Sequence, residues 1–372
     1  MTENNKIDLL VGGDEAFPKI FEAIDGAKES LNVSYYIFKN DPTGNTFADK
    51  LIDAEKRGVD VNISVDGIGS MQVVPESRAI LNRLEAGGVN VMRNHVVDFA
   101  RSGPVFNHPD HRKLVLVDGK TAFTGGMNVA DHYVCEYHDV MVQIQGPVVQ
   151  QMQSEWALSW MNLGGATLNE SGASRQEMKD KLFPEPVSSE KAEGAGMKAR
   201  VTQGIPGHNK EIFTEVLNLI NDAKDSIFIE NPYCTNPEIQ NALIDAGKRG
   251  IEIHVVLPGE SDHAFSHMAA RAKYPEMLAA GVHIHEYPGF NHGKFMVVDE
   301  EKVSIGSSNF DDVALRHIYE LNINCDDKDF AKSIKERLFD VDIPKCREMK
   351  PEDITPMQQA TGAFWNLFHD VI

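Results

Sequence analysis

The sequence contains few cysteines, and none of them forms a spacing typical of a redox or metal motif. Only four occur in 372 residues, at positions 135, 234, 325 and 346, and no two make a CxxC pair. This pattern argues against a disulfide-stapled fold and against a cysteine-based zinc site. We therefore expect free thiols and a reducing compartment.

Long apolar runs are also missing. No segment approaches the roughly 18 uninterrupted apolar residues that a transmembrane helix requires. The amino terminus, MTENNKIDLL, lacks the charged and apolar regions of a signal peptide. We therefore expect a cytoplasmic protein, with peripheral binding to the inner face of the cell membrane as the other arrangement that fits.

Positive charge is in deficit. The chain has 36 lysines and arginines against 56 aspartates and glutamates, a formal net charge of −20. A surface of this sign repels polyanions at long range, which makes a general nucleic-acid binder an unlikely class. Gly125-Gly126 lacks the GxGxxG spacing of a dinucleotide loop, and we expect neither a cofactor nor a metal ion.

One motif is present twice. The pattern His-x-Lys-x-x-x-x-Asp occurs at 111–118 and again at 292–299, and a turn of small residues that ends in asparagine follows each copy, at 125–128 and 306–309. Equivalent positions in the two copies lie 181 residues apart, since 292 − 111 = 181. A spacing kept over both the motif and its turn indicates duplication rather than coincidence.

The duplication extends over most of the chain. Three further pairs of segments match, namely 20–38 with 216–234, 51–67 with 243–259, and 84–91 with 277–284. Each half alternates helical periodicity with β-branched runs, which predicts an α/β fold with a mostly parallel sheet. We predict a lobe at 1–163, a Gly/Ser-rich connector at 164–200, and a second lobe at 201–372 that ends in an apolar helix.

The repeated motif predicts a phosphodiester site. Side chains two residues apart on a strand point to the same side, so each copy presents one imidazole and one ammonium. If the lobes pack about a pseudo-twofold axis, both copies meet in one shared site. The predicted catalytic residues are His111, Lys113, Asn128, His292, Lys294 and Asn309. Lysines and asparagine amides can stabilise the charge that develops on phosphoryl oxygens without a metal ion.

The two histidines require different protonation states. One must be neutral to attack phosphorus, and the other must be protonated to give the leaving oxygen its proton. A phosphohistidine intermediate then divides the reaction into two displacements, so that water as the second acceptor gives hydrolysis and an alcohol gives transfer. The residues alone do not say which histidine is the nucleophile.

Other repeated residues support these histidines. Asp139 and Glu320, again 181 positions apart, are candidates to orient the imidazoles through their second ring nitrogen. Asp118 and Asp299 end the two motifs on the opposite strand face, so we predict a structural role for them. The small turn residues Gly126 and Ser307 are predicted to be structural as well.

These motifs resemble those of the phospholipase D superfamily, whose members carry two HKD motifs, each followed by G-[GS]-x-N. The resemblance covers about residues 8 to 345. Within the superfamily the chain is most similar to bacterial cardiolipin synthases, through HRKLVLVDGKTAFTGGMNVADHY (111–133) and AEKRGVDVNISVDGIGS (54–70). The resemblance implies two α/β/α lobes with one active site, with His111 as the nucleophile and His292 as the acid and base.

The implied activity is phosphatidyl transfer, with phosphatidylglycerol as the favoured substrate. A hydrolytic phospholipase D that yields phosphatidic acid, and a phosphodiesterase or nuclease of the same fold, are the alternatives. We expect the chain to depart from the synthases in three respects. The given sequence shows none of the two amino-terminal membrane spans that they usually carry, and Asp110 stands where many synthases have an asparagine. Arg316-His317-Ile318-Tyr319 replaces the more apolar stretch that is usual before the second glutamate.

Overall fold

The computed structural model describes residues 1–70, 75–94, 108–162, 196–260, 264–355 and 361. The chain divides into two compact units. Unit 1 comprises Met1–Glu136 and Met141–Val201, and unit 2 comprises Tyr137–Val140 and Thr202–Ile372. Four residues of the predicted first lobe are thus built into unit 2. Most of the predicted connector and of the predicted carboxyl-terminal helix lies outside the described residues, and the lobe boundaries stay predictions.

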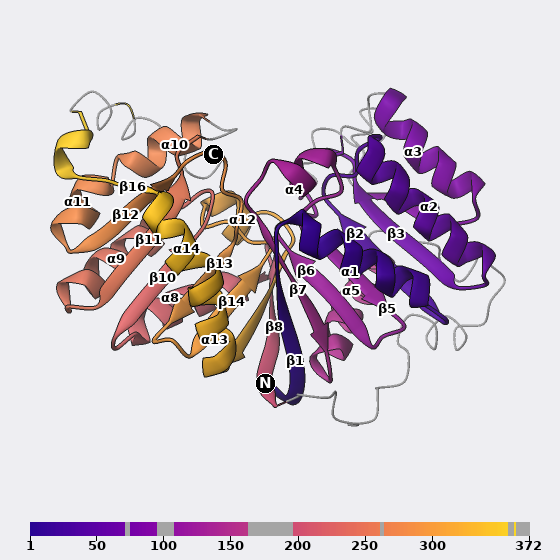
Figure 1. The fold of residues 1–372 in the computed structure, drawn as a ribbon, viewed down its shortest axis with the longest axis horizontal. Helices are drawn as coiled ribbons and strands as arrows, with labels where there is room; N and C mark the ends of the chain where they lie inside the picture. The colour runs from indigo at the N-terminus through magenta and orange to yellow at the C-terminus, as the bar shows by residue number, and fades with distance from the viewer. Residues whose placement is uncertain (71–74, 95–107, 163–195, 261–263, 356–360, 362–372) are drawn as a thin grey trace. The chain divides into compact units, whose positions relative to one another are not determined.

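The sheet of unit 1 has the strand order β1-β7-β6-β5-β2-β3-β4 (Figure 1). Its strands are β1 Thr2–Val11, β2 Ser30–Tyr35, β3 Asp60–Asp66, β4 Asn90–Asn94, β5 Leu114–Val117, β6 Thr121–Gly125 and β7 Val140–Gln145. Strand β8 (Met197–Ile205) begins in this unit, where it pairs antiparallel with β1. Residues assigned to the connector on sequence grounds therefore form a strand.

Helices cover both faces of this sheet. They are α1 Gly13–Gly26, α2 Pro42–Lys56, α3 Pro75–Ala86, α4 Asp131–Cys135 and α5 Val148–Asn162. Neighbouring residues of β2 show the two layers. The ring of Tyr35 packs edge-on against Phe47 of α2 at 5.6 Å, while Ser34, on the other face, accepts a 3.0 Å hydrogen bond from the indole of Trp156 in α5. The unit is thus an α/β/α sandwich.

Unit 2 repeats this plan with the strand order β16-β12-β11-β10-β13-β14-β15-β8. Its strands are β9 Asn209–Lys210, β10 Ser226–Glu230, β11 Glu252–Pro258, β12 Val282–Tyr287, β13 Phe295–Val298, β14 Lys302–Gly306, β15 Glu320–Asp326 and β16 Arg347–Glu348. Its helices are α8 Glu211–Asp222, α9 Pro237–Lys248, α10 Ala264–Arg271, α11 Tyr274–Ala279, α12 Asp312–Arg316, α13 Lys328–Ile334 and α14 Asp340–Asp342. A π-helical turn, Lys335–Phe339, joins the last two of these helices, and short 3-10 turns follow at Ile343–Lys345 and Pro351–Asp353.

The core of unit 2 also has two layers. Ile227 and Ile229 of β10 are fully buried in an apolar cluster with α8, α9 and α11. Phe228, between them, faces the other way, and its ring lies 5.3 Å from that of Phe339. The alternation of strand side chains therefore places helices on both faces here as well, and the predicted α/β class is confirmed.

The expectation of a mostly parallel sheet was too strong. In each unit three strands are parallel neighbours, β2-β3-β4 and β10-β11-β12. The motif strands β5 and β13 instead run antiparallel to their neighbours on both sides. The reason is local, because a tight turn after Asp118 or Asp299 returns the chain at once as a hairpin, whereas a parallel strand requires a longer crossover.

Equivalent capping residues begin and end the repeated helices. Asp41 accepts a hydrogen bond from Gly44 N at the start of α2, and Asn236 does the same for Ile239 N in α9, each before a proline at the first helical position. At the other end Gly58 and Gly250 adopt positive φ angles of 89° and 88°. Left-handed glycines stop both helices at the same place, so the following strands start in register.

Candidate active site

The first motif lies at the entry to β5, deep in unit 1. His111 is 9% exposed, and Lys113 is fully buried. The ammonium of Lys113 donates to the carbonyl of His111, and the hydroxyl of Thr124 donates to the carbonyl of Lys113 at 2.9 Å. A lysine held in this way presents its charge in a fixed position beside the histidine, where the low local dielectric strengthens its field.

The second motif has the same geometry at the entry to β13 in unit 2. His292 is 6% exposed and Lys294 is 1% exposed. Lys294 Nζ donates to the carbonyl of His292 at 2.7 Å, and Gly306 N donates to the carbonyl of Lys294. Both copies of the sequence pattern therefore build the same local arrangement of one buried imidazole and one buried ammonium.

The aspartate that ends each motif joins two strands. Asp118 has a φ of 53°, and its carboxylate accepts hydrogen bonds from the backbone N–H groups of Lys28, Glu29 and Ser30. Asp299, with a φ of 54°, accepts from the equivalent N–H groups, those of Lys224, Asp225 and Ser226. These contacts support the predicted structural role, since neither carboxylate is directed at its histidine.

Replacing Asp118 with alanine is expected to lower the free energy of unfolding of unit 1 by about 2 kcal/mol or more. Three charge-assisted hydrogen bonds are lost, and alanine tolerates the positive φ poorly. Denaturant unfolding followed by circular dichroism measures the change. Asp118→Asn should recover part of the loss because asparagine accepts a hydrogen bond and tolerates this φ. A large loss of turnover at unchanged stability would contradict the structural role.

The two asparagines have different surroundings. Asn128 accepts from Ile37 N at 2.9 Å and donates to the hydroxyl of Tyr133 at 2.8 Å. Asn309 Oδ1 is buried and has no hydrogen-bond partner in the structure. The second amide therefore retains more capacity for a ligand than the first, a difference that the matching sequence positions do not reveal.

His292 has a buried carboxylate partner. Its Nδ1 lies 2.6 Å from Oδ2 of Asp139, which is fully buried. Asp139 is separated from His292 by 153 residues and belongs to the short segment 137–140 that is part of unit 2. Sequence analysis identified Asp139 as an orienting acid but did not say which histidine it orients.

Glu320, the second predicted orienter, is fully buried at the start of β15. The hydroxyl of Ser307 donates to its carboxylate, and the same hydroxyl accepts from Leu321 N at 3.0 Å. Ser307 therefore holds this acid in place, whereas its equivalent Gly126 has no side chain. Orientation of a histidine by Glu320 stays a prediction.

Sequence reasoning missed Tyr36 and the importance of Asp110. The ring of Tyr36 meets that of His111 edge-on at 4.8 Å, and the ammonium of Lys113 lies 5.4 Å from the centre of the tyrosine ring. Asp110 forms a buried ion pair with Arg112 at 2.7 Å. The sequence could have predicted this ion pair, because Asp110 and Arg112 are two residues apart and carry opposite charges. The second copy has Asn291 and Gly293 at these positions and cannot form the pair.

Asp311 was also missed. It is buried next to Glu320 and Asn309, where it caps α12 by accepting from Ala314 N at 2.7 Å. Burial, together with the charges of Glu320 and Asp312, raises the pKa of Asp311 to about 7 despite this hydrogen bond. A carboxyl group beside the second motif therefore titrates near neutral pH.

The raised pKa of Asp311 predicts that Asp311→Asn stabilises the protein more at pH 8 than at pH 5. A carboxyl whose pKa is higher folded than unfolded costs stability as pH rises from about 4 through about 7. Asparagine retains the cap but cannot ionise, so the difference between variant and wild type should grow by about 1 kcal/mol or more over this range. Unfolding by denaturant at the two pH values measures it, and an equal difference at both would refute the titration.

The sequence is similar to those of known proteins over most of its length. A sequence profile described as "Cardiolipin synthase, PLD-like domain" matches residues 20–160 and 216–341. The chain is 29% identical to "Probable cardiolipin synthase YwiE" of Bacillus subtilis over 94% of its own length and 68% of that protein. It is 30% identical to "Major cardiolipin synthase ClsA" of the same organism over 90% of its length and 68% of that protein.

A solved structure supports the fold. The crystal structure of a phosphatidylserine synthase from Haemophilus influenzae aligns with a TM-score of 0.72 over 98% of this chain and 95% of the other, at 13% sequence identity.

Among the residues that the structure describes, no helix is long and apolar enough to cross a membrane. All four cysteines are free.

Proposed function

Because this chain belongs to the cardiolipin synthase family of phospholipase D-like proteins, we propose that it is a phosphatidyltransferase that joins two phosphatidylglycerols into cardiolipin and releases glycerol. The observation that carries the proposal is the duplicated motif. In each copy a buried lysine is tied to the backbone of a buried histidine, and this arrangement suits a phosphodiester.

The proposed reaction consists of two displacements at one phosphorus atom. In the first, a ring nitrogen of His111 bonds to phosphorus, the bond to the glycerol oxygen breaks, and His292 protonates that oxygen. In the second, neutral His292 takes the hydroxyl proton of another phosphatidylglycerol, and the alkoxide oxygen displaces His111. Both histidines must reach the same phosphorus atom, so the proposal includes one shared site.

The Asp139 contact supports the role assigned to His292. With its Nδ1–H donated to a buried carboxylate, His292 has Nε2 available to exchange a proton with substrate. The same carboxylate stabilises the imidazolium that the first step requires. Both the orientation and the charge state of this ring are therefore proposed to depend on Asp139.

Lys113 and Lys294 are proposed to stabilise the negative charge on the non-bridging oxygens, with help from the amides of Asn128 and Asn309. Fixed ammonium groups can do this in a water-poor site, because no solvent must reorganise during the reaction. The predicted reaction uses these side chains and needs no bound cofactor.

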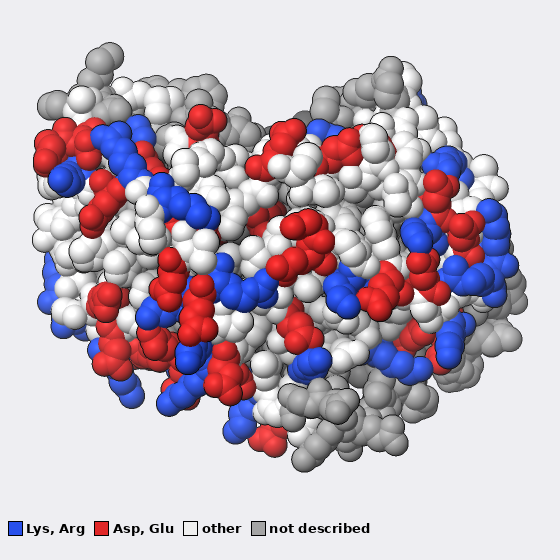
Figure 2. Space-filling model, in the orientation of Figure 1, with Lys and Arg blue, Asp and Glu red and all other residues white. Residues whose placement is uncertain are grey.

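The net charge favours a lipid over a nucleic-acid substrate. On the face shown in Figure 2, most lysines and arginines lie in small groups among aspartates and glutamates, apart from one short diagonal row of basic side chains at the upper left. Together with a formal charge of −20, this distribution does not suit a polyanion. The proposed substrate lies in a bilayer, so peripheral contact with the inner face of a membrane belongs to the proposal, and free thiols fit that compartment.

Incubation with phosphatidylglycerol vesicles, with lipid products identified by mass spectrometry, tests the function. Cardiolipin and glycerol in equal amounts are expected. Phosphatidic acid in place of cardiolipin would identify the protein as a hydrolase of the same family. No turnover of phosphatidylglycerol, with cleavage of another diester, would reject the proposed substrate. The His111→Ala variant serves as the inactive control.

A further inference from the structure

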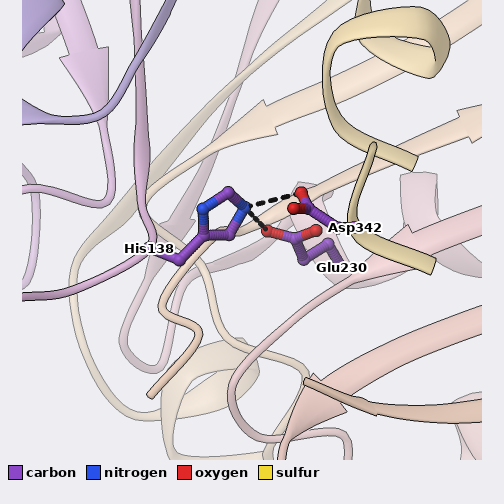
Figure 3. A group of neighbouring side chains, drawn as sticks. All are labelled: His138, Glu230 and Asp342. Atoms are coloured by element: carbon purple, nitrogen blue, oxygen red, sulfur yellow. Dashed lines mark ion pairs between the residues drawn. The ribbon is translucent and has the colours of Figure 1, made fainter. Parts of the chain in front are cut away.

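A buried ion cluster lies beside the second motif and has no counterpart in the first. His138 Nε2 is 2.9 Å from Asp342 Oδ2 and 3.3 Å from Glu230 Oε1 (Figure 3). The Glu230 side chain is fully buried and that of Asp342 is 1% exposed. The repeat places Tyr319 where His138 lies, 181 positions later, and Ser34 where Glu230 lies, 196 positions earlier. The cluster is therefore specific to unit 2.

The segment that carries His138 also carries the partner of His292. Residues 137–140 form a parallel bridge with Asn291, in which His138 N donates to Phe290 O at 3.2 Å and His292 N donates to His138 O at 2.7 Å. The next residue, Asp139, holds Nδ1 of His292. Any displacement of this segment would move the carboxylate away from the imidazole.

The carboxylates of Glu230 and Asp342 contact the segment 137–140 through His138. Burial by itself would lower the pKa of His138, but the facing carboxylates of Glu230 and Asp342 outweigh burial and raise it to about 11. His138 is therefore an imidazolium under ordinary conditions. Lys345 pairs with the second oxygen of Asp342 at 3.0 Å, and the ring of Tyr287 stacks on His138 at 4.9 Å.

Cys346 and Gly293 are further neighbours of the cluster. Cys346 Sγ lies 3.1 Å from the backbone oxygen of Asp342, and burial with the nearby carboxylates raises its pKa to about 12, so it stays a neutral thiol. Glu230 also lies against the motif itself, since a Cβ on Gly293 would come within 2.4 Å of its Oε1. The cluster thus contacts the second motif both through the bridging segment and through Gly293.

We infer that the His138–Glu230–Asp342 cluster anchors segment 137–140, so that His138 is a positioning residue that keeps Asp139 on Nδ1 of His292. This inference rests on the proposed function of His292 as the acid and base. It assigns His138 no contact with substrate. Loss of the imidazolium leaves the fully buried Glu230 without this charge partner and Asp342 with Lys345 in its place, which favours rearrangement of the segment.

One ring nitrogen of His138 and one carboxylate oxygen each of Glu230 and Asp342 lie within 4.8 Å of one another, so these three atoms could also coordinate a divalent cation. A proton on His138 Nε2 makes the ring an imidazolium, and its positive charge offsets the carboxylates at 2.9 and 3.3 Å, although neither oxygen is placed to accept Nε2–H as a hydrogen bond. The two arrangements exclude each other, because a metal ion at this nitrogen would replace the proton. Elemental analysis of the purified protein separates them.

The test is a double-mutant cycle between His138→Gln and Asp139→Asn, read as total phosphodiester turnover on phosphatidylglycerol vesicles. His138→Gln is expected to lower kcat about a hundredfold, on the scale of a displaced catalytic group, with KM within about threefold. In the Asp139→Asn background the same change should have almost no further effect, because the contact it protects is already lost. Two full, multiplying losses would overturn the inference.

Control variants distinguish a loss of kcat caused by displacement of Asp139 from one caused by misfolding of the protein. His283 forms a 3.0 Å ion pair with Glu348 away from the motif, so His283→Gln should leave kcat unchanged. If His138→Gln does not fold, Asp342→Asn takes its place in the cycle and should show the same loss of kcat that vanishes with Asp139→Asn. Stoichiometric zinc in the wild type that is lost in Asp342→Asn would also overturn the inference.

The readout distinguishes this inference from the function on which it rests. Total turnover counts both transfer and hydrolysis, so a wild type that makes phosphatidic acid would correct the proposed function without affecting the variant-to-wild-type ratio. If the wild type turns over and His138→Gln equals it in kcat, the anchor role is wrong while the proposed chemistry stands.

Discussion

Alanine at His111 or at His292 is expected to reduce kcat a thousandfold or more. One imidazole is proposed to form the bond to phosphorus and the other to move the proton, and neither step has a substitute group in the motif. Removal of one member of such a unit costs about as much as removal of all members, so the double variant should be hardly slower than either single one. Release of product from labelled phosphatidylglycerol measures the three rates.

The matched control for these variants is His283→Ala. This histidine is about half exposed and pairs with Glu348 at 3.0 Å, so its loss should leave kcat within about twofold. A mild reduction at His111 or His292, to a tenth or more of the wild-type rate, would remove that residue from the mechanism. Circular dichroism shows whether each variant is folded.

Asparagine at Asp139 is expected to reduce kcat by about a thousandfold to ten-thousandfold. Asparagine is nearly isosteric, but its amide can turn a donor toward Nδ1 and so favour the wrong tautomer of His292, as occurs when the aspartate of a catalytic triad is amidated. It also removes the charge that stabilises the imidazolium. KM should change little, because Asp139 is buried behind the ring and contacts no substrate in the proposed reaction.

The control for Asp139→Asn is the same change at Asp245, an exposed residue whose side chain pairs with Lys248 at 3.1 Å. Asp245→Asn should be indistinguishable from wild type. The pH dependence of kcat provides a second readout, since loss of the carboxylate should move the limb assigned to His292 toward lower pH. An unchanged profile together with unchanged kcat would show that the 2.6 Å contact has no catalytic role.

Sequence analysis singled out the proposed catalytic residues because they occur in a repeated pattern. The 181-residue spacing singled out both histidines and both lysines, and the structure places them in equivalent buried positions at the entries to β5 and β13. It also suggested that Asp118 is structural, since a strand reverses the direction of its side chains after an odd number of residues. The three backbone N–H groups that Asp118 binds agree with that expectation.

Residues without a repeat partner were harder to find. His138, Glu230 and Asp342 are far apart in the sequence and share no spacing, yet they meet in one buried cluster. Tyr36 likewise gains its importance from His111, which lies 75 positions away, whereas Asp311 gains its importance from burial beside Glu320. No local pattern reports a contact of this kind, because burial and the approach of distant charges are properties of the folded chain.

The sequence by itself determined the duplicated α/β plan and the paired histidines and lysines, and it predicted that they act on a phosphodiester. These follow from periodicity, spacing and the chemistry of side chains, which the linear chain carries. Only the tertiary structure decided that the motif strands run antiparallel to their neighbours, that segment 137–140 belongs to unit 2, and that Asp139 contacts His292. The physical reason is that the pairing of the motif strands with β2 and β10, and the contact of Asp139 with His292 across 153 positions, depend on how separate segments pack, and side-chain spacing does not encode that packing.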